Sequence, residues 1–385
     1  MRVDIAIIGG GVIGLSIAYH LKKLDKKRKI AVFERRYIGY GGSTRNASHF
    51  RVHFWTYENS LYASKSVEML KKFGGETGWN PTIMLGGYLW LISDEKILRA
   101  FRNSNEKIWR KLGNPVEFLD IEEIKRRYPY INLDGFIGGV FGPQDGKLHH
   151  DIVVYGYARS FLKMDGEIYQ YTPVTDILVK DNRVVGINLG NKTVETREVV
   201  VAAGEGSKIL LEDIGIDLPI RIIRKELYVS EPYSLFLDPL VIDTREDSRG
   251  LYISQSPRGE LMGSIDYPEA YNDFSHETTL THYLEYSKLL GRLIPILRYS
   301  TIMRCWSGNY VSTPDNSHIM GRDDEWPEGL YVVTGFSGHG FMMAPYTGYL
   351  MAKYLIREEM PREMAPYTPD RFRKRKLLGE TLVIG

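Results

Sequence analysis

The sequence predicts an α/β protein in which a nucleotide-binding domain is interrupted by a second domain. Three strand-like segments carry this prediction. Residues 2–8 form a β-branched run that leads directly into the glycines of residues 9–14. Residues 197–204 and 330–334 are two further apolar runs that lead into glycine turns, although they lie far along the chain. Short apolar runs of this kind are typical of buried parallel strands. The first domain is therefore expected to be assembled from distant parts of the sequence.

The first strand, its glycine turn and the helical pattern after it predict a Rossmann-type dinucleotide site. Gly9 can form the tight turn, Gly11 lets a pyrophosphate approach the backbone, and Gly14 lets helix and strand pack closely. The helix N-terminus then offers free N–H groups to the diphosphate. A second strand at 30–33 ends in Glu34, whose carboxylate can accept both ribose hydroxyls. A purely structural glycine turn is the alternative, and the motif does not distinguish FAD from NAD.

The remaining elements alternate between the two domains. A polar, glycine-broken loop at 35–46 replaces the next strand of a simple nucleotide domain. Helices are expected at 15–24, 58–73, 279–293 and 341–356, with another that ends near residue 112, and strands at 86–92 and in the β-rich section 174–189. We assign residues 1–80, 144–216 and 300–385 to the nucleotide-binding domain, and residues 81–143 and 217–299 to the second domain.

Composition excludes several classes of protein. The chain has 385 residues, of which 43% are hydrophobic and 25% charged, and its net charge of +2 calls for neither nucleic acid nor an anionic membrane as partner. For the basic clusters at 26–29 and 371–376 we favour a solvated turn and a solvated tail over docking patches. Enrichment in Lys, Glu, Arg, Ile and Tyr is typical of a thermophile.

Cysteine usage and hydropathy bear on the cellular compartment. The single cysteine, Cys305, excludes an intrachain disulfide and a cysteine-rich metal site, which fits a reducing cytoplasm. The first strand begins at Arg2, so no signal peptide fits, and no apolar run approaches the ~20 residues of a membrane span. The pair His149 and His150 lacks carboxylate or cysteine ligands at useful spacing, so we expect no metal.

The second motif with a mechanism is the strand at 330–334 with the loop and helix that follow it. Small residues at 335, 337, 338 and 340 allow a flat ring to approach the backbone. The N-terminus of the following helix can stabilise negative charge, such as that on the N1–C2=O edge of a reduced flavin. The alternative is a glycine-rich loop before a packed helix.

Four segments together resemble one family. They are the glycines at 9–14, the strand into Gly204, the segment 306–315 and the segment 335–345. Their combination resembles the D-amino-acid-oxidase-like (glutathione-reductase-2 type) FAD-dependent oxidoreductases, over essentially the whole chain. Within that family the chain is most similar to the β subunits of archaeal dye-linked L-proline dehydrogenases and of heterotetrameric sarcosine oxidases. The resemblance implies a Rossmann-like FAD-binding domain interleaved with an α+β substrate-binding domain built on a mainly antiparallel sheet.

The resemblance also implies an activity. It implies oxidation of the C–N bond of a secondary amino acid, such as L-proline or sarcosine, by hydride transfer to flavin N5, with electrons passed to an acceptor other than O2. A partner subunit in a hetero-oligomer is expected. An amino-acid or sarcosine oxidase that produces H2O2 stays open, as does a non-catalytic flavin-bearing subunit of an electron-transfer complex. An NAD-dependent dehydrogenase would leave the turn at Gly338 unexplained.

Site residues follow from the resemblance, position by position. Arg51 falls where the family has a carboxylate-binding arginine, although a surface salt bridge is the alternative. Tyr252 and Trp306 align with positions that face substrate, although buried aromatics are commonly core residues. His339 completes the catalytic candidates. Contacts to the cofactor are expected from Gly9, Gly11, Gly14, Glu34, Arg35, Ser43, Thr44, Arg45, Val174, Gly204, Gly308, Gly338, His339, Gly340, Phe341 and Met342.

Departures from the family pattern refine this expectation. Monomeric sarcosine oxidases attach FAD to a cysteine where this chain has Gly308, and Cys305 is out of place, so we infer non-covalent FAD. Those oxidases have a lysine where this chain has Met342. A second lysine, which activates O2, is replaced by an apolar residue near Leu261. Without that cation the reaction with O2 loses electrostatic help, which favours a dehydrogenase.

His150 is a candidate for a second flavin. The segment 147–151 resembles the place where sarcosine oxidase β subunits join FMN covalently to a histidine. The related proline dehydrogenases have no histidine there, yet they too bind FMN between subunits. A contact between His150 and FMN at a subunit interface is one interpretation, and a loop histidine or a helix-capping neighbour of Asp151 is the other.

Overall fold

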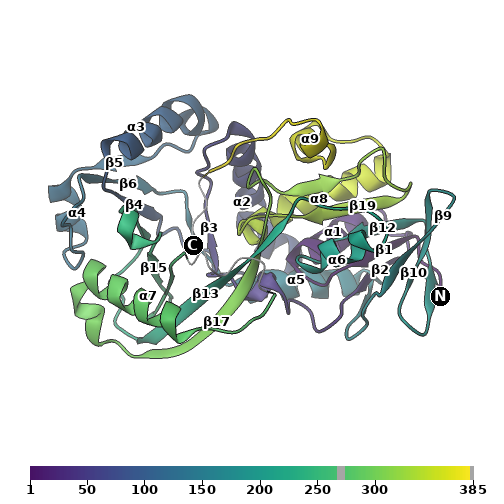
Figure 1. The fold of residues 1–385 in the computed structure, drawn as a ribbon, viewed down its shortest axis with the longest axis horizontal. Helices are drawn as coiled ribbons and strands as arrows, with labels where there is room; N and C mark the ends of the chain where they lie inside the picture. Colours follow the sequence, from purple (N-terminus) through teal and green to yellow (C-terminus); the bar gives the residue numbers. More distant parts are fainter. Residues whose placement is uncertain (267–273, 382–385) are drawn as a thin grey trace.

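The computed structural model describes residues 1–266 and 274–381, which form two domains side by side, each around its own sheet (Figure 1). The first sheet has the strand order β18-β19-β12-β1-β2-β8 and is parallel except for β18. Its strands are β1 (Ile5–Ile8), β2 (Ile30–Phe33), β8 (Glu167–Tyr169), β12 (Glu198–Val201), β18 (Ile319–Gly321) and β19 (Leu330–Thr334). Every residue of β1 and β2 is buried, as their continuous apolar sequence requires in a sheet covered on both faces.

Helices cover this sheet, and small residues allow them to approach closely. They include α1 (Val12–Leu24), α2 (Tyr57–Thr77), α5 (His150–Lys163), α6 (Gly206–Glu212), α8 (Gly340–Arg357) and α9 (Asp370–Arg373). An ideal Cβ on Gly348 of α8 would collide with Ser16 of α1, so glycine is needed where the two helices cross. Thr56 caps the start of helix α2, because its side chain accepts a bond from the Asn59 N–H, and Gly78, with φ of 79°, caps its end.

The second domain is built on a larger sheet with the order β17-β13-β16-β15-β14-β4-β6-β5. All its pairs are antiparallel except β14 with β4. Its strands are β4 (Tyr88–Ile92), β5 (Glu117–Leu119), β6 (Gly138–Gly142), β13 (Arg221–Pro232), β14 (Leu240–Asp243), β15 (Tyr252–Gln255), β16 (Glu260–Ser264) and β17 (Ile302–Ser312). Helices α3 (Glu95–Ser104), α4 (Ile121–Arg127) and α7 (Leu280–Leu293) belong to this domain, on the left in Figure 1. The predicted fold class is confirmed.

Smaller elements complete the chain. Strands β9 (Asp176–Lys180), β10 (Arg183–Asn188) and β11 (Thr193–Glu195) form a small antiparallel sheet, and β3 (His49–Phe50) pairs with β7 (Gly146–Lys147). The short helices are η1 (Gly42–Thr44), η2 (Asn105–Trp109), η3 (Arg110–Leu112), η4 (Glu246–Ser248), η6 (Pro295–Tyr299) and η7 (Arg362–Tyr367). Across residues 1–266 and 274–381, no helix has both the length and the apolarity to cross a membrane.

The structure differs from the sequence prediction at two places. The sequence division places residues 300–385 with the nucleotide domain, whereas β17 pairs with β13 along most of its length and so lies in the larger sheet. Both strands extend towards the nucleotide domain in Figure 1, which explains why an alternating pattern alone does not locate this boundary. The expected solvated tail at 371–376 is wrong for Arg371, which is buried and donates to Asp315 at 2.9 Å.

Candidate active site

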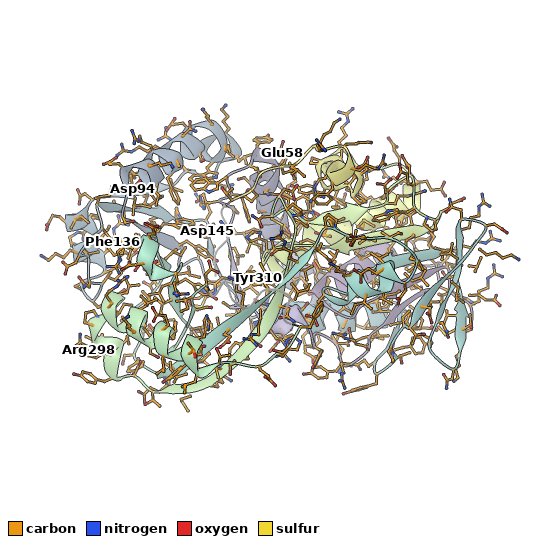
Figure 2. The ribbon with its side chains drawn as sticks, in the orientation of Figure 1. Glu58, Asp94, Phe136, Asp145, Arg298 and Tyr310 are labelled. Carbon is orange, nitrogen blue, oxygen red and sulfur yellow. The ribbon has the colours of Figure 1, made fainter. Side chains whose placement is uncertain are left out.

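A cavity of about 420 Å³ lies where the two domains meet. Its walls come from the carboxyl ends of β1, β2, β12 and β19, from the start of α8, and from β13, β15 and β17. Ile8, Phe33 and Val201 stand opposite one another in register, so these three strands end at the same edge. Such an edge is the usual binding place in parallel α/β sheets. Figure 2 labels Tyr310, a residue of this cavity, in the middle of the molecule.

The glycine turn after β1 has the geometry that the motif predicts. Gly9 has φ of +114°, and an ideal Cβ there would collide with the carbonyl of Ala202. A Cβ on Gly14 would collide with the carbonyl of Gly9, so Gly14 permits helix packing and does not line the cavity. Gly11 lines the cavity at the N-cap of α1 and has no side chain of its own to cap the helix, while the Ser43 hydroxyl accepts the first helical N–H, that of Val12. Ile13, the next residue of the helix, also lines the cavity, so the rest of the helix N-terminus faces this space and could bind an anion there.

Glu34 lines the cavity at the end of β2 with a fixed carboxylate. One oxygen accepts the N–H of Gly10 at 2.8 Å and the other accepts the N–H of Arg36 at 2.8 Å. Each carboxylate oxygen can accept more than one hydrogen bond. Both oxygens therefore keep acceptor capacity for the expected ribose hydroxyls.

The loop after β2 leaves room for an extended ligand. Gly41 and Gly204 line the cavity, and an ideal Cβ on either would have no atom within 4 Å. Ser43 also lines it and accepts the N–H of Val12 at 2.9 Å. Thr44 is not part of the cavity wall, because its hydroxyl donates to the carbonyl of Gly39 at 2.8 Å. The open space and the helix N-terminus fit a dinucleotide.

Side chains from distant segments meet around this end of the cavity. Arg35 pairs with Glu205 at 3.0 Å, and Asn309 donates to the same carboxylate at 2.6 Å. Arg45 donates to the carbonyls of Tyr40 and Ser307, at 3.0 and 3.1 Å. Val174 and Gly308, both expected to contact the cofactor, also line the cavity. The position of Gly308 thus offers no side chain to attach a cofactor, whereas Cys305 is exposed and lies outside the cavity wall.

The start of α8 forms a second helix N-terminus at the cavity. Gly338 has φ of +88°, and a Cβ there would collide with the ring of Tyr310, so only glycine suits this turn. His339 occupies the N-cap position without a side-chain capping bond. Gly340, Phe341 and Met342 line the cavity directly after it. Negative charge on a ligand at this place would be stabilised by the helix dipole.

Arg51 follows β3 and reaches the cavity from a fully buried position. Its guanidinium donates to the carbonyl of His53 at 2.8 Å and to Nε2 of His339 at 3.0 Å, and it lies over the Phe54 ring at 4.2 Å. Burial, and then the charge of Arg51, lower the pKa of His339 well below its ordinary value, so its Nε2 is an acceptor. Arg51 is thus a buried, oriented cation, and a surface salt bridge is excluded.

Behind Arg51 lies a buried carboxylate that the sequence analysis did not single out. Asp145, in the turn between β6 and β7, accepts the N–H of Val52 at 2.7 Å, and its other oxygen lies 2.7 Å from Nδ1 of His53. Asp145 and His53 are both fully buried. The carboxylate therefore fixes the backbone directly after Arg51. The only sequence signal is the acidic residue within the Gly142–Gly146 turn.

Three tyrosines line the same part of the cavity: Tyr88, Tyr252 and Tyr310. Burial raises the pKa of Tyr310 to about 12 and that of Tyr252 well above its ordinary value, so both are neutral phenols. The sequence analysis names Tyr252 as a candidate, whereas it does not name Tyr88 and Tyr310. Trp306 does not line the cavity, because its indole N–H donates to the carbonyl of Arg45 at 3.1 Å and its ring contacts the second-domain core.

Lys225 of β13 is a further cation of the cavity wall, in addition to Arg35, Arg45 and Arg51, and the sequence analysis missed it. Its ammonium contacts the carboxylate of Asp266 and lies 5.6 Å from the centre of the Tyr310 ring. An alternating strand gives no sequence signal for one lysine among its residues. Leu261, near the place where a lysine was expected to be replaced, is buried in the core of the second domain.

His150 lies at the first turn of α5, outside the wall of this cavity. Its Nδ1 contacts the hydroxyl of Ser48, and its Nε2 lies 3.2 Å from Asp151. Its side chain is 16% exposed. Because His150 lies outside the cavity wall, a second ligand at a subunit contact would occupy a site separate from the cavity. Within residues 1–266 and 274–381, no three His, Cys, Asp or Glu side chains are grouped as a metal site requires.

Comparisons with known proteins cover nearly the whole chain. A family model described as DAO, FAD dependent oxidoreductase, matches residues 4–354. Sarcosine oxidase subunit beta of Rhizobium meliloti is 28% identical over 383 residues, 98% of this chain and 90% of that protein. Glycine oxidase of Geobacillus kaustophilus is 25% identical over 383 residues, 96% of this chain and 97% of that protein. The crystal structure of L-proline dehydrogenase from P. horikoshii superposes with a TM-score of 0.90 and 28% identity, covering 98% of this chain and 99% of that one.

Proposed function

This chain belongs to the DAO family of FAD-dependent oxidoreductases, and we propose that it oxidises the C–N bond of a secondary amino acid such as L-proline or sarcosine. The predicted family and its cofactor, FAD, are confirmed. FAD supplies a two-electron acceptor when it is bound. The glycine turn, Glu34 and the open space at Gly41 and Gly204 would hold it.

The buried, oriented guanidinium of Arg51 is the observation that carries the proposed substrate class. A planar guanidinium binds a carboxylate through two parallel hydrogen bonds. His339 and the carbonyl of His53 fix its plane, at 3.0 and 2.8 Å. An amino acid whose carboxylate binds Arg51 would present its C–N bond to the same cavity.

The tyrosine wall supports a secondary amine as the substrate. The rings of Tyr88, Tyr252 and Tyr310 are apolar surfaces that suit a ring methylene or an N-methyl group. Relatives that act on such amines, by their names, are the sarcosine oxidase subunits and the L-proline dehydrogenase. The same wall would keep water from the reacting carbon.

We propose an electron acceptor other than O2. This chain has Met342 where the resemblance expects one lysine of the oxidases, and the second lysine, which activates O2, is replaced by an apolar residue near Leu261. A peroxide-producing oxidase is the second candidate, and Lys225 favours it, because this lysine supplies a cation to the cavity from another strand. The glycine oxidase relative agrees with that candidate.

We also propose a partner subunit and a non-covalent FAD. The sarcosine oxidase relatives are named as beta subunits, which supports a hetero-oligomer. The proposed FMN contact at His150 rests on the resemblance of the segment 147–151. The bare Gly308 at the cavity and the exposed Cys305 outside it support FAD held without a covalent bond.

Anaerobic reduction of the purified, FAD-loaded chain tests the proposed function. L-proline, sarcosine, glycine and D-alanine are added separately, and the visible absorbance of the flavin is followed before and after air is admitted. We expect bleaching by L-proline or sarcosine that persists in air without peroxide. Rapid reoxidation with peroxide would favour the oxidase. No bleaching with any amine would contradict an amino-acid oxidoreductase and favour a non-catalytic subunit.

A further inference from the structure

Lys225 occupies an unusual place in the cavity wall. On β13 it stands opposite Gly308 of β17, and its side chain, only 15% exposed, lines the cavity. Its Nζ contacts the carboxylate of Asp266, which follows β16 and is 46% exposed. Lys225 therefore connects the buried cavity with a carboxylate at the surface.

Tyr310 is close both to Lys225 and to Arg51, the residue proposed to bind the substrate carboxylate. The ring of Tyr310 lies 5.6 Å from Nζ of Lys225, and its hydroxyl is close enough to Arg51 for that charge to lower its pKa against the effect of burial. Arg51 and Lys225 thus approach the same tyrosine from different elements. An amino acid bound between them would have its carboxylate at one cation and its nitrogen free to face the other.

The proposed reaction requires the substrate nitrogen to lose a proton. Amino acids in neutral solution carry an ammonium group, because alkyl amines lose their proton only near pH ~10. Hydride can leave the adjacent carbon only when the nitrogen lone pair is free to form the C=N bond. A buried site with a fixed cation at Arg51 therefore needs a group that removes one proton.

Given the proposed function, we propose that Lys225 accepts the ammonium proton of the bound amino acid and that Asp266 passes this proton to solvent. The N–H bond of the substrate breaks and its electron pair stays on nitrogen, while a new N–H bond forms on the neutral amine of Lys225. The proton then moves to the Asp266 carboxylate and to water. Nothing is oxidised or reduced in this step.

The electrostatics of the site support this role. Burial lowers the pKa of Lys225 to about 7, and the Asp266 carboxylate in contact with its ammonium acts in the opposite direction. Apart from Lys225, the cavity wall has these titratable side chains: Tyr40, Tyr88, Tyr252, Tyr310, His49, His339, Glu34, Glu205, Glu226, Asp213, Arg35, Arg45 and Arg51. The two strands that pair with β13 add Arg304 and Cys305 on β17 and Glu260 on β16, and Asp266 follows β16. Glu226 is engaged by Tyr228 and Thr279, and His276 lies 3.8 Å from Glu205. Asp266 is the acid in contact with the Lys225 ammonium.

The test compares pH profiles of anaerobic flavin reduction by L-proline and sarcosine in the wild-type protein and in Lys225→Arg, Lys225→Met and Asp266→Asn. In the wild type, the limiting rate should rise through pH about 7. Arginine keeps the positive charge but does not release its proton in this range, so Lys225→Arg should be ~100-fold slower at neutral pH. Both Lys225 variants should approach the wild-type rate near pH ~10, where the substrate loses its proton unaided.

Asp266→Asn and an amine-free ligand provide the controls. Loss of the carboxylate lowers the pKa of Lys225, so in Asp266→Asn the limiting rate of flavin reduction should rise at a lower pH than in the wild type. Tetrahydro-2-furoic acid, which has oxygen in place of the proline nitrogen, should perturb the flavin spectrum of Lys225→Met at concentrations close to those for wild type.

Two results would overturn the proposal. One is a wild-type pH profile in both Lys225 variants, and the other is an equal loss of rate at every pH, which indicates a structural role. A wild-type flavin that no amine reduces would instead refute the proposed function, and the proposal on Lys225 with it.

Discussion

Arg51 and Lys225 are both cations of one cavity, but their surroundings differ. Arg51 is fully buried, and His339 and the carbonyl of His53 accept its protons. Lys225 has a pKa lowered to about 7 by burial and contacts a half-exposed carboxylate. A guanidinium keeps its charge across the physiological pH range, whereas a buried lysine exchanges its proton readily. The first environment therefore suits permanent binding of an anion, and the second suits movement of a proton.

Removal of the fixed cation should have the largest effect on substrate binding. Arg51→Ala should raise the KM for the amino acid ~100-fold or more, because hydrogen bonds to a charged group are lost, each worth ~1.5–3 kcal/mol. FAD retention, measured from the visible spectrum after gel filtration, should change little. An unchanged KM would show that Arg51 does not bind the substrate, and the proposed contrast between Arg51 and Lys225 would be wrong.

Loss of the support behind Arg51 should have an intermediate effect. Asp145→Asn weakens the buried contact with His53 and loosens the backbone after Arg51, so KM should rise ~10-fold and the free energy of unfolding should fall by ~3 kcal/mol. Steady-state kinetics and urea unfolding measure the two quantities. The exposed turn variant Asp181→Asn is the matched control and should change neither. If Asp145→Asn lowered kcat alone, the carboxylate would act on the reaction and not through the position of Arg51.

The pH dependence of anion binding should show the smallest effect. Between pH 6 and pH 9 Arg51 stays charged and His339, with a pKa well below its usual range, stays neutral. Affinity for tetrahydro-2-furoic acid should therefore fall only slightly as pH rises through about 7, where Lys225 loses its charge. A spectral titration at each pH measures it. A large drop at that pH would mean that Lys225 shares in carboxylate binding.

The part of the site that could be predicted from the sequence is the part that depends on local spacing. Gly9, Gly11 and Gly14 act through backbone geometry within one strand-turn-helix unit, and Gly338 acts in the same way before α8. Such positions have a fixed distance along the chain, so the motif already contains their geometry. Arg51 and Tyr252 came from the family resemblance.

The part that could not be predicted depends on the pairing of distant strands. Lys225 faces Asp266 because β13 pairs with β16 and β17, and nothing in the spacing of these residues indicates that contact. Tyr88 and Tyr310 reach the same cavity from β4 and β17. Arg371 appeared solvated in a basic tail, yet Asp315, in a turn after β17, pairs with it in the interior. A run of charged residues predicts an exposed segment, but a buried partner elsewhere in the chain can hold one of its side chains in the interior.

A crystal structure of the FAD-loaded protein with tetrahydro-2-furoic acid tests most directly whether Arg51 binds the substrate carboxylate while Lys225 faces the substrate nitrogen. The account predicts the ligand carboxylate at the Arg51 guanidinium in a two-bond arrangement, and the ring oxygen on the side of Lys225. A carboxylate bound to Lys225 instead, with the ring oxygen towards Arg51, would contradict it.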